Sequence, residues 1–423
     1  MLSDNPGFSK RPRVVIIGAG FGGLTAAITL RKAPVDVTLL DQHNYHLFQP
    51  LLYQVATAGL SPAQIASPIR RIVARQKNVT VLMDKVVDID PLQHEVVTAT
   101  RRLPFDYLIV ATGARHAYFG NDQWEEFAPG LKQIDEATEI RRRILLAFEK
   151  AETATDEAER RRLLTFIVVG GGPTGVEMAG AIAELAHRTL RRDFRHIDPT
   201  ESRIILIEAG PRVLSAFPES LSQSAAEQLA KLGVTVSTGA AVTGVDATGI
   251  DLKDGSRIGA GTIIWAAGVT ASPAARWLKV DSDRAGRVVV DAMLHPAGLE
   301  NIFVIGDTAT VTDGNGVVAP GIAPAAKQMG HYAARAIITR IAQRPVGPFK
   351  YRNYGNLATI GRKSAVADFG SFRLSGFFAW VVWCFAHIWF LIGFRNRIIV
   401  FLDWVVAYFS FARGARLITG GED

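Results

Sequence analysis

The sequence predicts an α/β fold with two Rossmann-like dinucleotide-binding domains, followed by a helical region at the C-terminal end. Three observations predict it. Two segments with the pattern G-x-G-x-x-G, at Gly18–Gly23 and Gly170–Gly175, each stand between an apolar strand and a helix. A later apolar strand at Asn301–Ile305 again runs into a glycine. The last part of the chain is rich in Trp and Phe.

The first glycine pattern begins a dinucleotide-binding unit. Four β-branched residues, Val14–Ile17, are typical of a strand buried on both faces. Gly18 permits the tight turn, Gly20 lets backbone approach a pyrophosphate, and Gly23 lets the helix pack on the strand. Asp41 ends the next strand, where an acid hydrogen-bonds the ribose hydroxyls. A glycine turn that serves packing alone is the alternative, and the position of Asp41 argues against it.

Four segments connect this unit to the next. Residues 42–56 are rich in aromatic side chains and are suited to lining a flat ring, with a packed loop as the alternative. Residues 79–90 predict short strands, and residues 105–113 predict a buried strand that ends in a turn of small residues. Residues 135–162 are charged and predict a pair of solvated helices.

The second unit repeats the first. The strand Phe166–Val169 enters Gly170, Gly172 and Gly175, and the following strand ends in Glu208. Because the helix after the glycines continues to about Phe194, this acid comes later than usual. Two complete modules predict two dinucleotide sites.

Two further strands end in glycine turns. Thr262–Ala267 runs into Gly268, as residues 105–110 run into the turn of Ala111 and Gly113. Asn301–Ile305 runs into Gly306 and Asp307, which alone predicts no more than a turn and a helix cap.

Composition excludes several kinds of site. The single cysteine, Cys384, cannot form an intrachain disulfide, a Cys-x-x-Cys redox pair or a metal site built from cysteines, so we expect no metal. The net charge of +7 is modest and no Lys/Arg block resembles a nucleic-acid-binding arm. Met1–Arg13 has no apolar run, so we expect no secretory signal.

The C-terminal region predicts attachment to a membrane surface. Residues 377–392 and 398–413 are two apolar runs with arginines at their ends. A spanning helix needs about twenty apolar residues, whereas the first run is short and the second contains Asp403. We therefore expect amphipathic helices within 376–419 that lie in the headgroup region. A short hairpin into the bilayer and a buried dimer interface are the alternatives.

Together these residues resemble the two-dinucleotide-binding-domain flavoproteins, in which the second nucleotide domain is inserted into the first. The resemblance implies an FAD-binding domain of residues 1–115 and 295–345, an NADH-binding domain of 163–270, and a membrane-associating C-terminal region of 346–423. It implies FAD at Gly18, Gly20, Gly23, Asp41, Ala111, Gly113, Gly306 and Asp307, and NADH at Gly170, Gly172, Gly175, Glu177, Glu208 and Gly268.

Glu208 also bears on which nicotinamide nucleotide is used. A carboxylate about 4 Å from a 2′-phosphate repels it by roughly 4 kcal/mol per unit charge at an effective dielectric of about 20, or nearly three powers of ten. This favours NADH over NADPH unless Arg212 moves in to offset the charge.

Within this superfamily, the missing cysteines argue against disulfide reductases and sulfide:quinone oxidoreductases. The segment Ala319–Gly330 looks like the quinone-site signature A-Q-x-A-x-Q of type II NADH:quinone oxidoreductases. Ala323, Ala326 and Gln328 match it, and Pro324 stands where the first glutamine is expected. The alternative is an ordinary helix N-terminus, where Pro is common. We expect quinone contacts at Ala323, Pro324, Lys327 and Gln328.

The resemblance implies FAD-dependent transfer of two electrons from NADH to a membrane quinone, ubiquinone or menaquinone, without proton pumping. It places the chain in respiratory electron transport, as a peripheral, monotopic protein on the cytoplasmic face of the cell membrane, with a homodimer left open. Gln328 would orient the quinone carbonyl, and Glu177 would place the nicotinamide or relay a proton, unless it only suits the helix dipole. Two rivals stay open: a soluble reductase of a protein acceptor and a non-catalytic nucleotide sensor.

Overall fold

The computed structural model describes residues 11–410 and 413–419 and forms two compact units. The first unit comprises Met1–Leu47, Ser67–Arg115 and Val269–Asn353, and the second comprises Phe48–Ala66, His116–Gly268 and Tyr354–Asp423. Residues 1–10 and 420–423 of the expected domains, and residues 411–412 of the expected anchoring segment, lie outside the described residues. The domain ranges expected from the sequence stay predictions.

A five-stranded parallel sheet in the order β20-β9-β1-β2-β5 forms the core of the first unit. Its strands are β1 (Arg13–Ile17), β2 (Asp36–Asp41), β5 (Val79–Met83), β9 (Tyr107–Val110) and β20 (Ile302–Val304). The late strand β20 therefore pairs in the same sheet that carries the first glycine pattern. The α/β fold with parallel Rossmann-like sheets is confirmed.

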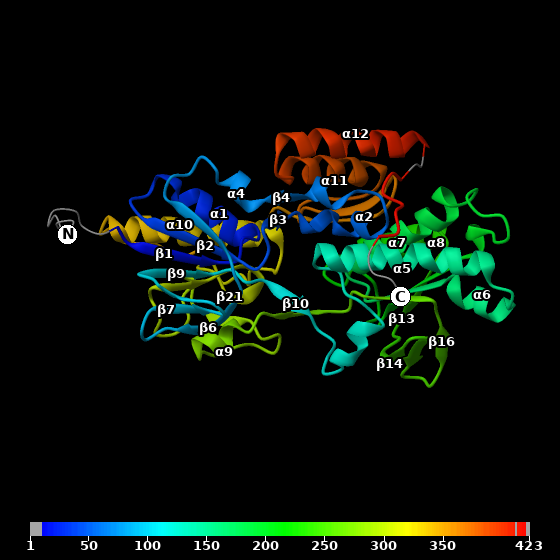
Figure 1. Cartoon of the computed structure of the whole chain (residues 1–423), viewed down its shortest axis with the longest axis horizontal. Coiled ribbons are helices and arrows are strands. Elements are labelled where there is room, and N and C mark those ends of the chain that lie inside the picture. The colour runs from blue at the N-terminus through cyan, green and yellow to red at the C-terminus, as the bar shows by residue number, and fades with distance from the viewer. Residues whose placement is uncertain (1–10, 411–412, 420–423) are drawn as a thin grey trace. The chain divides into compact units, whose positions relative to one another are not determined.

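Helices α1 (Phe21–Thr29) and α10 (Ala323–Ile341) pack against each other in the first unit (Figure 1). Glycines permit this close approach, because a Cβ on Gly330 would overlap the carbonyl oxygen of Gly22. Pro324 lies in the first turn of α10, as the helix-start interpretation of this segment expected.

Smaller elements complete the first unit. They are β3 (Tyr45–Leu47), β4 (Ala66–Pro68), α4 (Ile69–Ile72), the antiparallel β6 (Val86–Asp90), β7 (Glu95–Thr98) and β8 (Arg102–Pro104), β10 (Ala114–His116), β18 (Val269–Ala271), α9 (Ala274–Leu278), β19 (Val288–Val290) and β21 (Ala309–Val311).

A four-stranded parallel sheet in the order β13-β12-β11-β17 organises the second unit. Its strands are β11 (Thr165–Val169), β12 (Arg203–Glu208), β13 (Val234–Thr238) and β17 (Thr262–Trp265). The expected pair of charged helices is present as α5 (Ile134–Thr153) and α6 (Glu157–Leu163). One face of α5 is exposed to solvent, whereas Ile140, Ile144 and Phe148 on its other face are fully buried.

Helix α7 (Pro173–Glu184) follows the second glycine pattern and ends earlier than the sequence suggested. A π-helical turn at Leu185–Thr189 follows it, and the chain then turns instead of continuing as helix to Phe194. The remaining elements before the C-terminal region are α2 (Leu52–Ala56), α3 (Pro62–Ile65), α8 (Glu219–Lys231), β14 (Val242–Asp246), β15 (Gly249–Leu252) and β16 (Arg257–Gly259).

The C-terminal region consists of an antiparallel sheet and two helices. The elements are β22 (Asn356–Gly361), β23 (Ser364–Asp368), β24 (Arg373–Gly376), α11 (Phe377–Phe390) and α12 (Phe394–Ser410). Helices α11 and α12 lie side by side (Figure 1). Among the described residues, none of the helices combines the length and the apolar character needed to cross a membrane.

Candidate functional site

The first glycine turn has the shape that a bound dinucleotide requires. Gly18 has φ of +97°, and a Cβ there would overlap the carbonyl oxygen of Ala111. A Cβ on Gly23 would overlap the carbonyl oxygen of Gly18, so the helix packs on the turn as expected. Around Gly20, by contrast, nothing lies within 4 Å of a Cβ position. The turn therefore leaves open space where a pyrophosphate would approach the backbone.

Asp41 holds this turn from the end of β2. Its Oδ2 accepts the N–H of Ala19 at 2.6 Å, and its Oδ1 accepts the N–H of His43 at 2.8 Å. The Nδ1 of buried His46 lies 2.7 Å from the carbonyl oxygen of Ala19. Burial lowers the pKa of His46, so its ring stays neutral beside the turn.

The second glycine turn reproduces the first. Gly170 has φ of +110°, a Cβ on Gly175 would overlap the carbonyl oxygen of Gly170, and Gly172 faces open space. Glu208, at the end of β12, accepts the N–H of Gly171 on Oε2 at 2.6 Å. The residues present at both turns thus fit an ADP moiety.

Arg212 does not compensate the charge of Glu208. Its guanidinium donates to the carbonyl oxygens of Phe217 at 2.7 Å and Ser215 at 3.0 Å, and to Oγ of Ser222 at 2.9 Å. The other oxygen of Glu208, Oε1, accepts the N–H of Gly210 at 2.6 Å. Use of NADPH would require Arg212 to leave these partners and approach Glu208, so the arrangement favours NADH.

The late Gly-Asp turn lies beside the turn after β9. The N–H of Gly113 donates to Oγ1 of Thr308 at 2.8 Å, which brings the expected FAD residues Ala111 and Gly113 next to Gly306 and Asp307. Gly306 has φ of +68°, a conformation that favours glycine. Gly268, expected at NADH, lies in the second unit with the ring of Phe119 against it.

Glu177 lies near the start of α7 in the second unit. The N–H of Thr359, on β22, donates to its Oε1 at 3.4 Å. Loss of water around the carboxyl raises its pKa to about 8, and the Thr359 bond offsets only part of this effect. A carboxyl that keeps its proton gains nothing from the helix dipole, which argues against the alternative interpretation of Glu177.

The residues expected at the quinone lie on α10 in the first unit. The side-chain amide of Gln328 forms two hydrogen bonds with the backbone of Arg352: Nε2 donates to the carbonyl oxygen and Oε1 accepts the N–H, each at 2.9 Å. The Nζ of Lys327 lies 5.5 Å from the ring centre of Phe21. Ala323 and Pro324 form the first turn of the helix. Gln328 keeps one amide hydrogen that Arg352 does not use.

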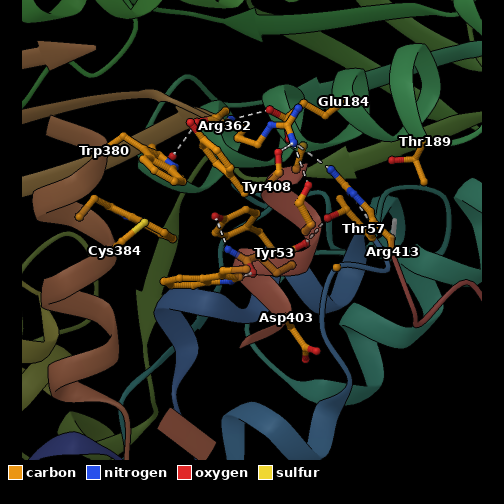
Figure 2. Close-up of a pocket in the computed structure, with 18 residues that line it drawn as sticks. Tyr53, Thr57, Glu184, Thr189, Arg362, Trp380, Cys384, Asp403, Tyr408 and Arg413 are labelled. Atoms are coloured by element: carbon orange, nitrogen blue, oxygen red, sulfur yellow. Dashed lines mark hydrogen bonds and ion pairs between the residues drawn. The ribbon is translucent and has the colours of Figure 1, made fainter. Parts of the chain in front are cut away.

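A cavity of about 120 Å³ lies within the second unit, between α2, the end of α7, β22 and the two C-terminal helices (Figure 2). A single water needs roughly 10–15 Å³, so the cavity has room for a ligand of many atoms. Tyr53, Trp380, Trp383 and Trp404 supply aromatic walls. The sequence indicated that residues 42–56 are suited to lining a flat ring, but no motif assigned a role to Tyr53 or Gln54.

An ionic cluster closes one side of this cavity (Figure 2). Glu184 accepts the backbone N–H of Arg362 at 2.5 Å and pairs with Arg413 at 3.4 Å. Arg413 also donates to the carbonyl oxygen of Thr57 at 2.6 Å, and Arg362 donates to that of Ala407 at 2.8 Å. The guanidinium groups are thereby committed to the protein.

The outer face of α11 and α12 is apolar and exposed. Its exposed large apolar residues are Phe377, Phe378, Phe385, Trp389, Phe390, Phe394, Ile398, Phe401, Leu402, Val405, Val406 and Phe409. We call this set the aromatic face. Large apolar side chains exposed along two adjacent helices mark an interaction site.

Comparison with known proteins identifies the family. The model of the pyridine nucleotide-disulphide oxidoreductases matches residues 12–330, and the model of the NDH2 C-terminal domain matches residues 354–413. The type II NADH:quinone oxidoreductase Ndh of Mycobacterium tuberculosis is 49% identical over 97% of this chain and 91% of that protein. This chain belongs to the type II NADH:quinone oxidoreductases. A second such enzyme of M. tuberculosis, NdhA, is 48% identical over 97% of this chain and 90% of its own length.

Solved structures agree with this fold. The NDH2 of Plasmodium falciparum in complex with NADH has a TM-score of 0.88 and 22% identity, covering 97% of this chain and all of that one. The sulfide:quinone oxidoreductase of Aquifex aeolicus has a TM-score of 0.73 and 18% identity, covering 94% of this chain and 95% of that one. The chain is thus a type II NADH:quinone oxidoreductase, a flavoprotein that uses NADH and quinone.

Proposed function

We propose that this type II NADH:quinone oxidoreductase binds FAD on the first glycine turn and NADH on the second, and reduces a membrane quinone. The overall reaction is NADH + H⁺ + quinone → NAD⁺ + quinol. FAD, when bound, supplies the acceptor for the hydride and the donor of two electrons to the quinone. The protein binds and orients the partners and excludes water.

The close similarity of the two glycine turns is the observation that supports the two proposed nucleotide sites. Each turn carries a carboxylate, Asp41 or Glu208, on the N–H that follows the first glycine. Each also leaves the second glycine, Gly20 or Gly172, facing open space. The N–H groups at the start of the following helices then face the phosphates.

The aromatic cavity is our proposed site for the quinone ring. Its walls come from Tyr53 on α2 and from Trp380, Trp383 and Trp404 on the C-terminal helices. A flat, uncharged ring with two carbonyl acceptors suits aromatic walls that carry a few hydrogen-bond donors. On α10 in the first unit, Gln328 is proposed separately as a quinone donor through its remaining amide hydrogen, as the signature suggests.

Glu177 is proposed as a proton-holding group. Reduction of a quinone to a quinol takes up two protons, and NADH supplies only one with its hydride. A carboxyl whose pKa is about 8 keeps a proton at neutral pH and can release it when a stronger base forms nearby. The carboxyl would then be reprotonated from solvent.

The aromatic face is proposed to dock on the lipid headgroup region, and the cytoplasmic face of the cell membrane is proposed as the side on which it docks. Each large apolar side chain that enters the lipid boundary contributes roughly 1.5–3 kcal/mol before ordering costs. Arg395, exposed in the first turn of α12, provides charge attraction to anionic lipid. A second copy of the chain on this face would give a homodimer instead.

Vesicles that contain ubiquinone test this function. We expect the FAD-loaded protein to bind them without detergent and to oxidise NADH only when the vesicles carry the quinone. Equal rates with a soluble protein acceptor and no vesicle binding would favour the soluble reductase. NADH binding without any oxidation would favour the nucleotide sensor.

A further inference from the structure

We propose that the hydroxyl of Tyr53 donates a hydrogen bond to a quinone carbonyl in the aromatic cavity, and that Trp404 is a positioning residue that aims this hydroxyl through Gln54. The inference rests on the proposed function of the cavity. It names a donor and a positioning residue that lie outside the signature on α10.

The orientation of the Gln54 amide is fixed by Trp404. An indole N–H can only donate, and Nε1 of Trp404 lies 2.8 Å from Oε1 of Gln54. The amide oxygen of Gln54 therefore faces Trp404, and its NH₂ group faces the other way. Nε2 of Gln54 then donates to the hydroxyl oxygen of Tyr53 at 2.8 Å.

This chain of bonds decides how Tyr53 uses its own proton. Because the hydroxyl oxygen accepts from Gln54, the O–H group must point elsewhere. Tyr53 is 7% exposed and lines the cavity, and the described part of the chain offers no acceptor for this proton (Figure 2). A buried donor without an acceptor is costly unless a ligand supplies one.

The tyrosine stays in its donor form. Burial raises the pKa of Tyr53 well above its usual value, and the nearby carboxylates Glu177 and Glu184 add to the effect. The phenol therefore keeps its proton throughout turnover and orients the carbonyl without transferring charge.

The walls of the cavity favour an uncharged ligand. The unused hydroxyl of Tyr53 lies among aromatic walls that include Trp383, whose side chain is 2% exposed, and such a setting selects a neutral acceptor such as a carbonyl. The guanidinium groups of Arg362 and Arg413 are already engaged, so the cavity does not favour an anion.

Trp404 links this donor to the membrane-facing helix. It lies on α12, between Leu402 and Val405 of the aromatic face. The adjacent Asp403 accepts a hydrogen bond from Nε2 of Gln64 on α3, so two neighbouring residues tie α12 to the segment that carries Tyr53. A change in the position of α12 would therefore change the orientation of the Tyr53 hydroxyl.

The first test replaces the hydroxyl alone. We expect Tyr53→Phe in the FAD-loaded enzyme to raise the KM for ubiquinone-1 roughly three- to tenfold, as loss of one neutral hydrogen bond predicts, while NADH reduces the flavin at an unchanged rate. Binding of ubiquinone-1 to the oxidised enzyme, followed by tryptophan fluorescence, should weaken by the same factor. The control Tyr118→Phe removes a hydroxyl that donates to the carbonyl oxygen of Ala128 at 2.9 Å, and its quinone KM should not change.

The second test separates positioning from simple packing. Trp404→Phe keeps a ring and removes the N–H, and Gln54→Leu removes the relay; each should raise the quinone KM without changing the NADH half-reaction. If both act through Tyr53, adding either change to Tyr53→Phe should cause no further loss. Additive losses, or an unchanged KM in Tyr53→Phe, would overturn the proposal. If the unaltered enzyme failed to reduce quinone, the proposed function itself would fall instead.

Discussion

Glu208 accepts a hydrogen bond from the second glycine turn: its Oε2 lies 2.6 Å from the backbone nitrogen of Gly171. Asp41 accepts the N–H of Ala19, in the first glycine turn, at the same distance. Both carboxylates are therefore held next to the phosphate-binding turn before any nucleotide arrives. The hydroxyls of a ribose can donate hydrogen bonds to such a carboxylate, whereas a 2′-phosphate is repelled by its negative charge.

Glu208→Gln should weaken the preference for NADH. The change removes the charge and keeps one oxygen for the N–H of Gly171 but loses the bond from the N–H of Gly210, so the turn should persist with a modest loss of stability. We expect the ratio of kcat/KM for NADH to that for NADPH to fall by roughly ten- to several hundred-fold, less than the full Coulomb estimate because solvent screens the site. Steady-state rates with both nucleotides measure the ratio, and an unchanged ratio would show that Glu208 does not face the 2′ position.

Gly172→Ala and Gly175→Ala form a matched pair that separates ligand binding from folding. A Cβ at Gly172 meets open space, so we expect unchanged thermal stability and a loss of NADH affinity where the pyrophosphate approaches. A Cβ at Gly175 overlaps the carbonyl oxygen of Gly170, so we expect a loss of roughly 1–3 kcal/mol in the free energy of unfolding. Calorimetry and NADH titration distinguish them; equal effects on affinity and stability would contradict the assignment.

Glu177 predicts a pH dependence. Its pKa of about 8 lies above the ordinary carboxyl value, so the proton is present below pH 8 and lost above it. We expect quinone reduction to decline as pH rises through about 8, and Glu177→Gln to lower the rate and remove this decline. The same raised pKa means that the contribution of Glu177 to stability is fully present below its ordinary pKa of 4.5 and is lost as pH rises towards 8. A Glu177→Gln enzyme with the unaltered pH profile would exclude the proton role.

The aromatic face predicts membrane attachment that can be removed without damage to catalysis. Phe385 and Trp389 are 76% and 73% exposed, so the double change to Asp should leave folding intact. We expect co-sedimentation with anionic vesicles to fall at least tenfold, since each large apolar contact is worth roughly 1.5–3 kcal/mol. Ubiquinone-1 turnover should be retained. Leu92→Asp, at an 86% exposed apolar residue of the first unit, is the control and should bind vesicles normally. Dissociation of a dimer by the double change, with vesicle binding intact, would assign the face to a second copy instead.

The sequence was informative where function depends on local backbone. The glycine turns, Asp41, Glu208 and the late Gly-Asp turn were all visible because each requires a particular residue type at a fixed spacing. The aromatic cavity was not, since Gln54 and Trp404 are 350 residues apart in the chain and neither belongs to a motif. Likewise, no pattern indicated that Arg212 is held by its own loop or that Gln328 pairs with the backbone of Arg352. Side-chain hydrogen bonds between distant segments depend on tertiary packing.

Transfer of electrons from NADH to quinone is tested most directly by mixing the FAD-loaded enzyme with NADH in the absence of oxygen and then adding ubiquinone-1. The account predicts that NADH rapidly bleaches the visible flavin absorbance and that the quinone restores it, with one quinol formed for each NADH oxidised. A flavin that NADH bleaches but ubiquinone-1 does not restore would contradict quinone reduction by this chain.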